Sequence, residues 1–233
     1  KPAQQNDQAP ETVKTLSFRQ LKNDLWIMMK NRQMWTIGIV GALFYLPASV
    51  FLDVWGLTYL KNVYHLSPNA AAFGVSTMLA GWIFSSFAAG TLSDLFGSRK
   101  IPLLIGTFSA ALVASLIMFF PGIPKVALYV LLFIFGIFCG PHHLCFTLSK
   151  ENNAQAVSGT AIAFVNFLIM MGGFIFHPVV GKLLDLGWKG TFAASGAPVY
   201  AGSDYTMALT IIPIGLLIAG ILTLTIKETY QKH

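Results

Sequence analysis

Charge is what this sequence has least of. Only 10% of its 233 residues are Asp, Glu, Lys or Arg, whereas a soluble domain typically carries about 25%. A chain of this length could bury a sizeable core, but it has too few charged groups to cover a surface that faces water. Hydrophobic residues make up 55% of it. The deficit indicates that lipid surrounds much of the protein.

The few charges are also unevenly placed. Six stretches contain no Asp, Glu, Lys or Arg, and each is long enough for a helix that crosses a hydrocarbon core of about 30 Å. Backbone in lipid must satisfy its own hydrogen bonds, so we expect helices. The sequence therefore predicts an all-α integral membrane protein with six transmembrane helices at 34–60, 68–94, 101–121, 126–149, 157–184 and 204–228.

The basic residues favour one side of that membrane. Six spans place both termini on the same side, which holds eleven of the Lys and Arg residues against four on the other. By the positive-inside rule we expect both termini in the cytoplasm and a multi-pass protein of the inner (plasma) membrane. A net charge of +6 could also indicate nucleic-acid binding. Because the basic residues follow the membrane pattern, we exclude nucleic acid as a partner.

Cysteine is scarce as well. The two cysteines, Cys139 and Cys145, fall six residues apart in the fourth predicted span, on different faces of a helix. This favours small packing residues over a disulfide or a metal site. The chain contains no His-Glu-x-x-His, no Gly-x-Ser-x-Gly and no pair of carboxylates within the spans. We expect no metal, no cofactor and no catalytic residue, and keep an intramembrane enzyme as the least favoured alternative.

The segment before the first span has two parts. Residues 1–14 are rich in Gln, Asn, Pro and Ala, begin without Met and resemble a cytoplasmic linker cut from something longer. Residues 15–33 predict an amphipathic cytoplasmic helix, which either lies on the inner face of the membrane or docks on cytoplasmic loops. Its expected capping pair and apolar stripe are Ser17 with Gln20, and Leu21, Leu25 and Met28.

The spans contain a short internal repeat. The pattern Gly-x-Leu-x-Asp-Leu occurs at 90–95, where the second span ends, and at 181–186, where the fifth ends. The two copies are expected on opposite sides of the membrane. Two inverted three-helix repeats produce this arrangement.

A longer motif covers the turn after the second span. It reads Gly90-Thr-Leu-Ser-Asp94-Leu-Phe-Gly97-Ser-Arg99-Lys100. It resembles the Gly-x-x-x-Asp-x-x-Gly-x-Arg-Arg/Lys loop of the major facilitator superfamily, which joins the second and third helices of each six-helix half on the cytoplasmic side. Gly90 and Gly97 suit a close helix approach and a tight turn. Leu95 stands where many members carry a basic residue.

The resemblance implies that the chain is the C-terminal half of a twelve-helix carrier. Residues 34–229 would form the bundle and 230–233 a cytoplasmic tail, while an N-terminal half would be the missing partner. Asp94 is placed either to accept hydrogen bonds from N–H groups at a helix N-terminus or to pair with Arg99. The resemblance implies that the motif locks the two halves together in one state. The alternative is a turn at the membrane border that only fixes topology. In overall character the chain is also similar to bacterial metabolite:proton symporters, including the phagosomal-transporter branch.

Ionisable groups in the spans are the first candidates for a site, because burying one in lipid costs about 2.5–3.5 kcal/mol on insertion scales. Asp53 is the only acidic residue well inside a span and shares a helix face with Tyr45 and Ser49. We interpret Asp53 as a substrate-amine or proton site. An interfacial carboxylate in an outer vestibule is the equal alternative.

Two adjacent histidines lie deep in the fourth span. His143 shares a face with Gly136, Gly140 and Thr147, which suits either a cavity wall or a close helix contact. Histidine titrates near neutral pH and can couple transport to protons. For His143 and His142 alike, a hydrogen bond to a neighbouring helix is the simpler alternative.

The fifth span carries a stripe of small and polar residues. Asn166 lies near its middle, where substrate sites of such carriers lie, and Met170 belongs to the same stripe. The alternative for Asn166 is an interhelical hydrogen bond worth about 0.6 kcal/mol. Trp82, midway along the second span, could present its indole N–H to a pocket, although packing is the commoner role.

Residues and resemblance together predict secondary active transport of a small polar metabolite by alternating access. The expected substrate contacts are Asn166, Tyr45, Asp53, His143, Trp82 and Met170, with Asp53 and His143 also coupling protons. A six-helix membrane module without transport activity is the alternative.

Overall fold

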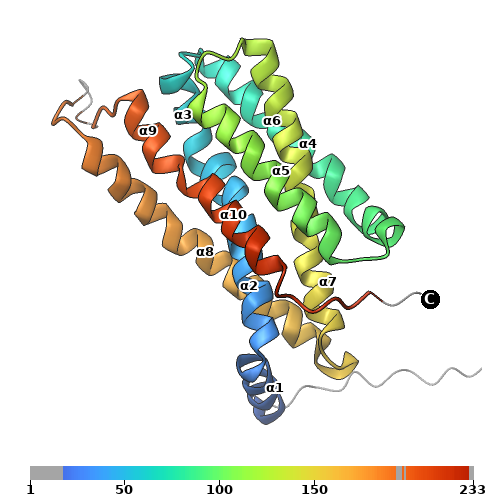
Figure 1. Cartoon of the computed structure of the whole chain (residues 1–233). Coiled ribbons are helices and arrows are strands. Elements are labelled where there is room, and N and C mark those ends of the chain that lie inside the picture. The colour runs from blue at the N-terminus through green and yellow to red at the C-terminus, as the bar shows by residue number, and fades with distance from the viewer. Residues whose placement is uncertain (1–17, 193–195, 197, 231–233) are drawn as a thin grey trace, which may run out of the picture.

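A computed structural model of the protein describes residues 18–192, 196 and 198–230. The described chain is a bundle of helices, and six of them are long and apolar enough to cross a membrane. The first described helix and the C-terminal segment lie at the same end of the bundle (Figure 1). The six-span prediction is confirmed, with spans at Arg32–Val63, Pro68–Phe96, Lys100–Phe119, Lys125–Glu151, Gln155–Gly187 and Gly202–Thr223.

Two spans are interrupted at prolines. The first consists of α2 (Arg32–Phe44), a π-helical stretch (Pro47–Trp55) and α3 (Gly56–Val63). The fourth consists of α6 (Lys125–Cys139), a 3-10 turn (Gly140–His143) and α7 (Leu144–Glu151). Proline has no N–H and cannot continue the regular hydrogen-bond ladder, so the backbone rewinds around Pro47 and Pro141.

The other spans are more regular. The second is α4 (Pro68–Phe96), the third α5 (Lys100–Phe119), and the fifth a 3-10 turn (Gln155–Val157) followed by α8 (Ser158–Gly187). The sixth consists of α9 (Gly202–Leu209) and α10 (Ile211–Thr223).

The end of the sixth span differs from the prediction, because α10 stops at Thr223 and not at residue 228. After Thr223 the backbone hydrogen bonds connect residues three apart, as in a 3-10 turn. The last of these bonds runs from the Ile226 N–H to the Thr223 carbonyl at 3.1 Å. The Lys227 N–H then donates to the Gln33 side chain at 2.9 Å instead of extending the helix. The chain therefore leaves the span five residues earlier than its apolar composition suggests.

The amphipathic segment forms α1 (Phe18–Lys30), which ends before the first span begins. Asn31 separates the two helices, because its side chain accepts the Gln33 N–H at 3.0 Å and caps α2. Met28 is fully buried, whereas Leu21 and Leu25 stay 40% and 39% exposed. The predicted stripe thus docks through one residue, and the capping residue Ser17 lies outside the described residues.

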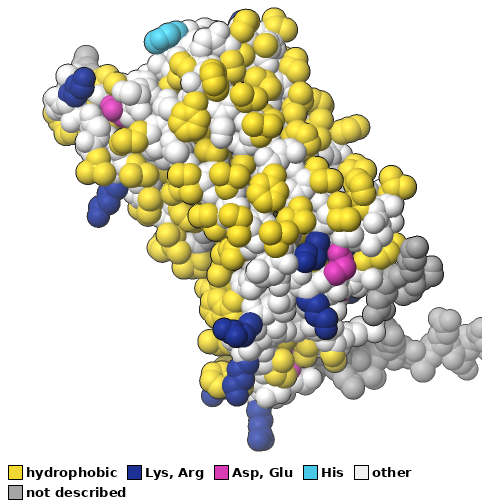
Figure 2. Space-filling view, in the orientation of Figure 1, with side chains coloured by type: hydrophobic (Ala, Val, Ile, Leu, Met, Phe, Trp, Pro, Cys, Tyr) yellow, Lys and Arg dark blue, Asp and Glu magenta, His cyan; other side chains and the backbone are white. Residues whose placement is uncertain are grey.

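The two copies of the internal repeat lie at opposite ends of the bundle, since α4 and α8 run in opposite directions (Figure 1). The helices differ in how well their neighbours cover them. Each span contains an apolar stretch of 18 residues, and the share of that stretch buried inside the bundle can be compared between spans. The share is 28% in α4 and 33% in the span containing α8, against 50–61% in the other four spans. Figure 2 shows a broad hydrophobic zone, with most of the visible Lys and Arg below it at the end that carries α1.

Candidate functional site

Three predicted pocket residues meet in one aromatic cluster at the middle of the bundle. The Trp82 ring of α4 lies 5.7 Å from the ring of Tyr45 and 6.3 Å from that of His143, between centroids. His142 completes the cluster, 5.1 Å from Tyr45 and 5.0 Å from His143. The break at Gly140–His143 is what presents two successive histidines to the same aromatic neighbours.

The two histidines have different surroundings. His142 is only 3% exposed, and neither ring nitrogen has a hydrogen-bond partner among the described residues. His143 is exposed, and its Nδ1 lies 3.1 Å from the Gly140 carbonyl oxygen. The glycine stripe around His143 makes a close helix contact, because a Cβ on Gly136 would overlap the Met78 carbonyl of α4. The glycines therefore do not line a cavity, whereas His143 does.

That cavity is a pocket of about 340 Å³ beside α4. Its wall is mostly apolar and includes two polar side chains that sequence reasoning did not place together, Ser86 and His143. The lining residues are Leu79, Trp82, Ile83, Ser86, Phe87 and His143.

Asp53 lies apart from this pocket. It is exposed on the π-helical stretch, within electrostatic range of Tyr45 and of His177 from α8. Ser49 lies beside α8 as well, since a Cβ on Gly173 would come 3.5 Å from the Ser49 Cβ. The structure therefore brings Asp53 within electrostatic range of His177, a neighbour that the sequence did not identify because the two are 124 positions apart.

Asn166 and Met170 are not among the residues of the aromatic cluster or its pocket. Both are exposed and share one outward face of α8 with Phe167 and Phe174. An amide on such a face needs a partner outside this half bundle. The expectation that Asn166 contacts substrate stays a prediction.

The motif after α4 forms a charged network with the ends of two other spans. The Arg99 guanidinium contacts Asp94 at 2.8 Å, as predicted, and also Glu151 at the end of α7 at 3.0 Å. Gly97 makes the tight turn in a left-handed conformation, with φ of 58°. The Lys100 ammonium donates to the Leu224 carbonyl at 2.9 Å.

Two further observations concern this motif. Within this half bundle nothing lies within 4 Å of the place where the Gly90 Cβ would be, so the close helix approach expected at Gly90 stays a prediction. The carboxylates of Glu151 and Glu228 were not predicted at all. Glu228 accepts the Arg99 and Lys100 backbone N–H groups at 3.0 and 3.2 Å, and also binds the Ser98 hydroxyl. Burial alone lowers the pKa of Arg99, but the hydrogen bonds that its guanidinium donates to Glu151 and Asp94 outweigh that effect and raise the pKa.

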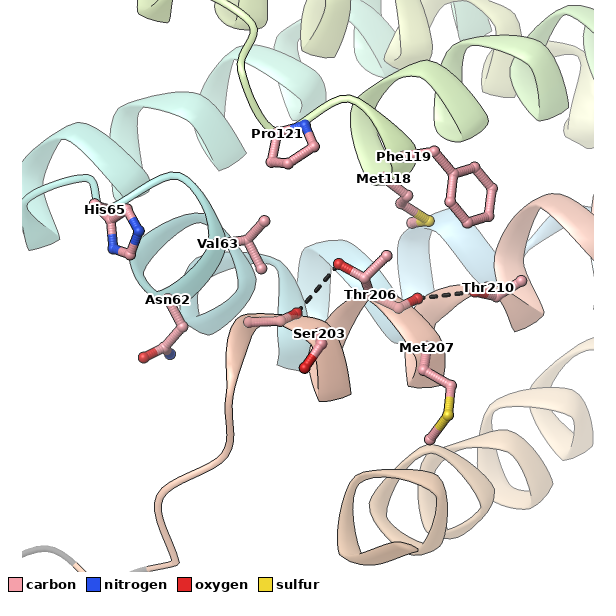
Figure 3. A pocket seen from close by; sticks show the side chains of 11 residues that line it. Asn62, Val63, His65, Met118, Phe119, Pro121, Ser203, Thr206, Met207 and Thr210 are labelled. Atoms are coloured by element: carbon pink, nitrogen blue, oxygen red, sulfur yellow. Dashed lines mark hydrogen bonds between the residues drawn. The ribbon is translucent and has the colours of Figure 1, made fainter. Parts of the chain in front are cut away.

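A second hollow, of about 690 Å³, opens at the other end of the bundle, among the ends of α3, α5 and α9 (Figure 3). Thr206 and Thr210 face it, but their hydroxyls donate to the carbonyls of Gly202 and Thr206 at 3.1 and 2.8 Å. No predicted site residue lines it. Within the described ranges, no group of His, Cys, Asp and Glu is arranged to hold a metal ion.

Comparison with known proteins gives consistent matches. Residues 37–203 match the family model of the Major Facilitator Superfamily. The riboflavin transporter RibZ of Clostridioides difficile (strain 630) is 25% identical over 213 residues, 88% of this chain and 46% of that protein. The inward-open xylose transporter XylE of E. coli superposes with a TM-score of 0.64 at 19% identity, over 88% of this chain and 48% of XylE. The chain spans about half the length of both relatives.

Proposed function

Because this chain belongs to the major facilitator superfamily, we propose that it forms the C-terminal half of a twelve-helix carrier that moves a small polar metabolite across the membrane. Its relatives are transporters, which assigns it to transport and not to enzymes. Two six-helix bundles would rock about a site near the midplane. Riboflavin is one candidate substrate, through the likeness to RibZ.

The uncovered faces of α4 and α8 carry this proposal. These two spans are the least buried of the six. The helical glycines that have open space above their Cα, Gly90, Gly159 and Gly181, all lie on α4 and α8. Small residues let membrane helices approach closely, and lipid has no need of them. We infer that the N-terminal half packs against these faces.

Polar groups on the same side support that inference. Asn166 is exposed on α8, and His143 is exposed beside α4. Both would be costly against hydrocarbon, whereas a protein partner or a water-filled cavity would satisfy them. The pair of Asp53 and His177, together with His143, supplies groups that could exchange protons with the cavity.

The orientation belongs to the same proposal. The charged network of Asp94, Arg99, Glu151 and Glu228 lies at the end of the bundle where α1 and the C-terminal segment also lie (Figure 1). We place that end in the cytoplasm, because eight of the twelve Lys and Arg residues within the described ranges belong to it.

The first test is the intact mass of the natural gene product. A mass near twice 25.4 kDa supports a twelve-helix carrier. A mass near 25.4 kDa would leave transport to a dimer and favour the non-transporting module. Uptake by the complete product in proteoliposomes, with and without a pH gradient, then tests transport and proton coupling separately.

A second test addresses the docking faces. Gly159→Leu should abolish uptake by the complete carrier, because the added side chain fills the space left for the other half. Ala127→Leu adds comparable bulk at an exposed position of α6 and should leave uptake unchanged. Equal uptake by both variants would show that lipid, and not protein, covers α8.

A further inference from the structure

The pocket beside Trp82 is an open, mostly apolar hollow on α4 with the polar side chains of Ser86 and His143 in its wall. Trp82 lies midway along α4, so the pocket lies near the middle of the membrane. It opens on the least buried span of the bundle. Its two polar side chains, Ser86 and His143, would be unfavourable against lipid. The pocket therefore faces the space between this half and its partner.

Two of the three side-chain hydrogen-bond donors on the pocket residues, those of Ser86 and His143, already have partners. The Ser86 hydroxyl donates to the Trp82 carbonyl at 2.7 Å. A carbonyl oxygen can only accept, so the His143 Nδ1 that lies 3.1 Å from the Gly140 oxygen must carry the hydrogen. In the neutral ring Nε2 is then an acceptor. The indole N–H of Trp82 is buried and does not reach the pocket. The wall offers acceptors to a ligand and no free side-chain donor.

The rest of the wall is aromatic and aliphatic. The Trp82 ring forms one side, and Phe87 is 84% exposed on the same helix. Behind Trp82, the rings of Tyr45 and His142 lie 5.7 and 6.2 Å from the indole, nearly edge-on to it. This packing holds the indole in place while the half-buried Trp82 side chain also lines the pocket. Flat aromatic surfaces bind other rings by stacking.

We propose that this pocket binds a planar heteroaromatic ring of the transported molecule, stacked on Trp82 and donating an N–H to His143 Nε2. The inference rests on the proposed transport function and narrows its substrate class. Sugars without an aromatic ring would not use this pocket. A ring that carries only acceptors would find no donor in the wall.

The test measures binding, not transport, with the complete gene product in detergent and riboflavin as the probe. Riboflavin has a planar ring system with one imide N–H, and its own fluorescence falls when it stacks on an indole. Trp82→Ala should weaken binding about 5- to 10-fold, the loss expected for one aromatic pair, while Trp82→Phe should keep most of it. Phe120→Ala removes an exposed ring at the end of α5, away from the pocket and from α8, and serves as the matched control, with unchanged affinity.

The hydrogen bond is tested by changing both partners. His143→Leu should weaken riboflavin binding about 5-fold, the loss expected for one hydrogen bond, and His143→Gln, which retains an acceptor, should restore much of it. A riboflavin methylated on the imide nitrogen should bind the wild type as weakly as riboflavin binds His143→Leu. The same analogue should lose nothing further in that variant.

The outcomes separate this inference from the proposed function. D-xylose at high concentration should not displace riboflavin from the wild type. Absence of saturable riboflavin binding, or equal affinities for Trp82→Ala and Phe120→Ala, overturns the pocket assignment. Uptake of another solute would then leave the transport proposal intact. Riboflavin binding that depends on Trp82 in a protein that transports nothing would uphold the pocket and overturn transport.

Discussion

The backbone N–H of Arg99 donates to the Glu228 carboxylate at 3.0 Å. This bond ties the turn after α4 to the segment that follows α10. Partial burial would raise the pKa of Glu228. Hydrogen bonds from Ser98 and from the backbone N–H groups of Arg99, Tyr230 and Lys100 outweigh that effect and lower the pKa to about 2. The ends of the second and sixth spans are thus joined by one ionised side chain.

Glu228→Gln should therefore destabilise the protein at neutral pH. The folded pKa lies below the ordinary value of 4.5, so the stabilisation is complete above about pH 4.5 and is lost as the pH falls toward 2. Because the side chain is largely exposed, we expect only about 0.5–1 kcal/mol. Thermal unfolding in detergent at pH 7, 5 and 3 should show a gap between wild type and variant that closes with acid. A difference in stability that stays the same at all three pH values would contradict the role of ionised Glu228.

Arg99→Lys should impair transport by the complete carrier more than it impairs folding. The guanidinium contacts Asp94 and Glu151 together, and a single ammonium cannot reproduce both sets of donors. If the network stabilises one state of the transport cycle, the uptake rate should fall about tenfold, the size of a typical coupling between states. Lys150→Arg, a nearby exposed exchange of the same kind, should have no effect. If uptake fell equally in Arg99→Lys and Lys150→Arg, the motif would only fix the topology of the turn.

Gly136→Ala and Gly90→Ala should have opposite effects on stability. A Cβ on Gly136 would meet the Met78 carbonyl and the backbone N of Trp82, which lies 2.8 Å away. Separating α4 from α6 should cost about 1–3 kcal/mol. A Cβ on Gly90 meets nothing, so alanine should stabilise the helix by up to about 1 kcal/mol in the 233-residue chain. The unfolding midpoint should therefore be lower than that of the wild type for Gly136→Ala and higher for Gly90→Ala. An unchanged midpoint for Gly136→Ala would contradict the close contact between α4 and α6.

Tyr200 should titrate above the ordinary range of tyrosine. Its hydroxyl donates to Asp185 Oδ1 at 2.6 Å, and this bond, with some burial and the nearby negative charge, raises the pKa of Tyr200 to about 12. The bond stabilises the fold below about pH 10 and is lost as the pH rises toward 12. The ultraviolet difference between wild type and Tyr200→Phe should show this late ionisation. Asp185→Asn should return it toward 10.

The spans were predictable because lipid imposes a simple rule on the sequence. A missing charge over about 20 residues marks a crossing whatever the packing inside, and the chain obeys this six times. The ends were less predictable. The sixth helix stops at Thr223 because Lys227 and Glu228 bond to Gln33 and to the turn after α4, and composition holds no signal for such contacts.

The candidate site was predictable in part. Helical spacing identified Tyr45, Trp82 and His143 one by one, and the structure brings them together. Spacing could not show that His142 would be buried and His143 exposed, because a 3-10 turn replaces the regular helix there. Glu151 and Glu228 were missed because they reach Arg99 across 52 and 129 positions.

Both native cysteines of the chain are inside the bundle, Cys139 at 2% and Cys145 at 0% exposure. A folded sample should therefore react slowly with maleimide reagents. A single cysteine introduced at Ser67, before α4, or at Lys150, near the end of α7, would stand out against this background. Labelling of these two positions with a membrane-impermeant reagent could then report on which side of the membrane each of the two loops lies, without removal of the two buried thiols of this half.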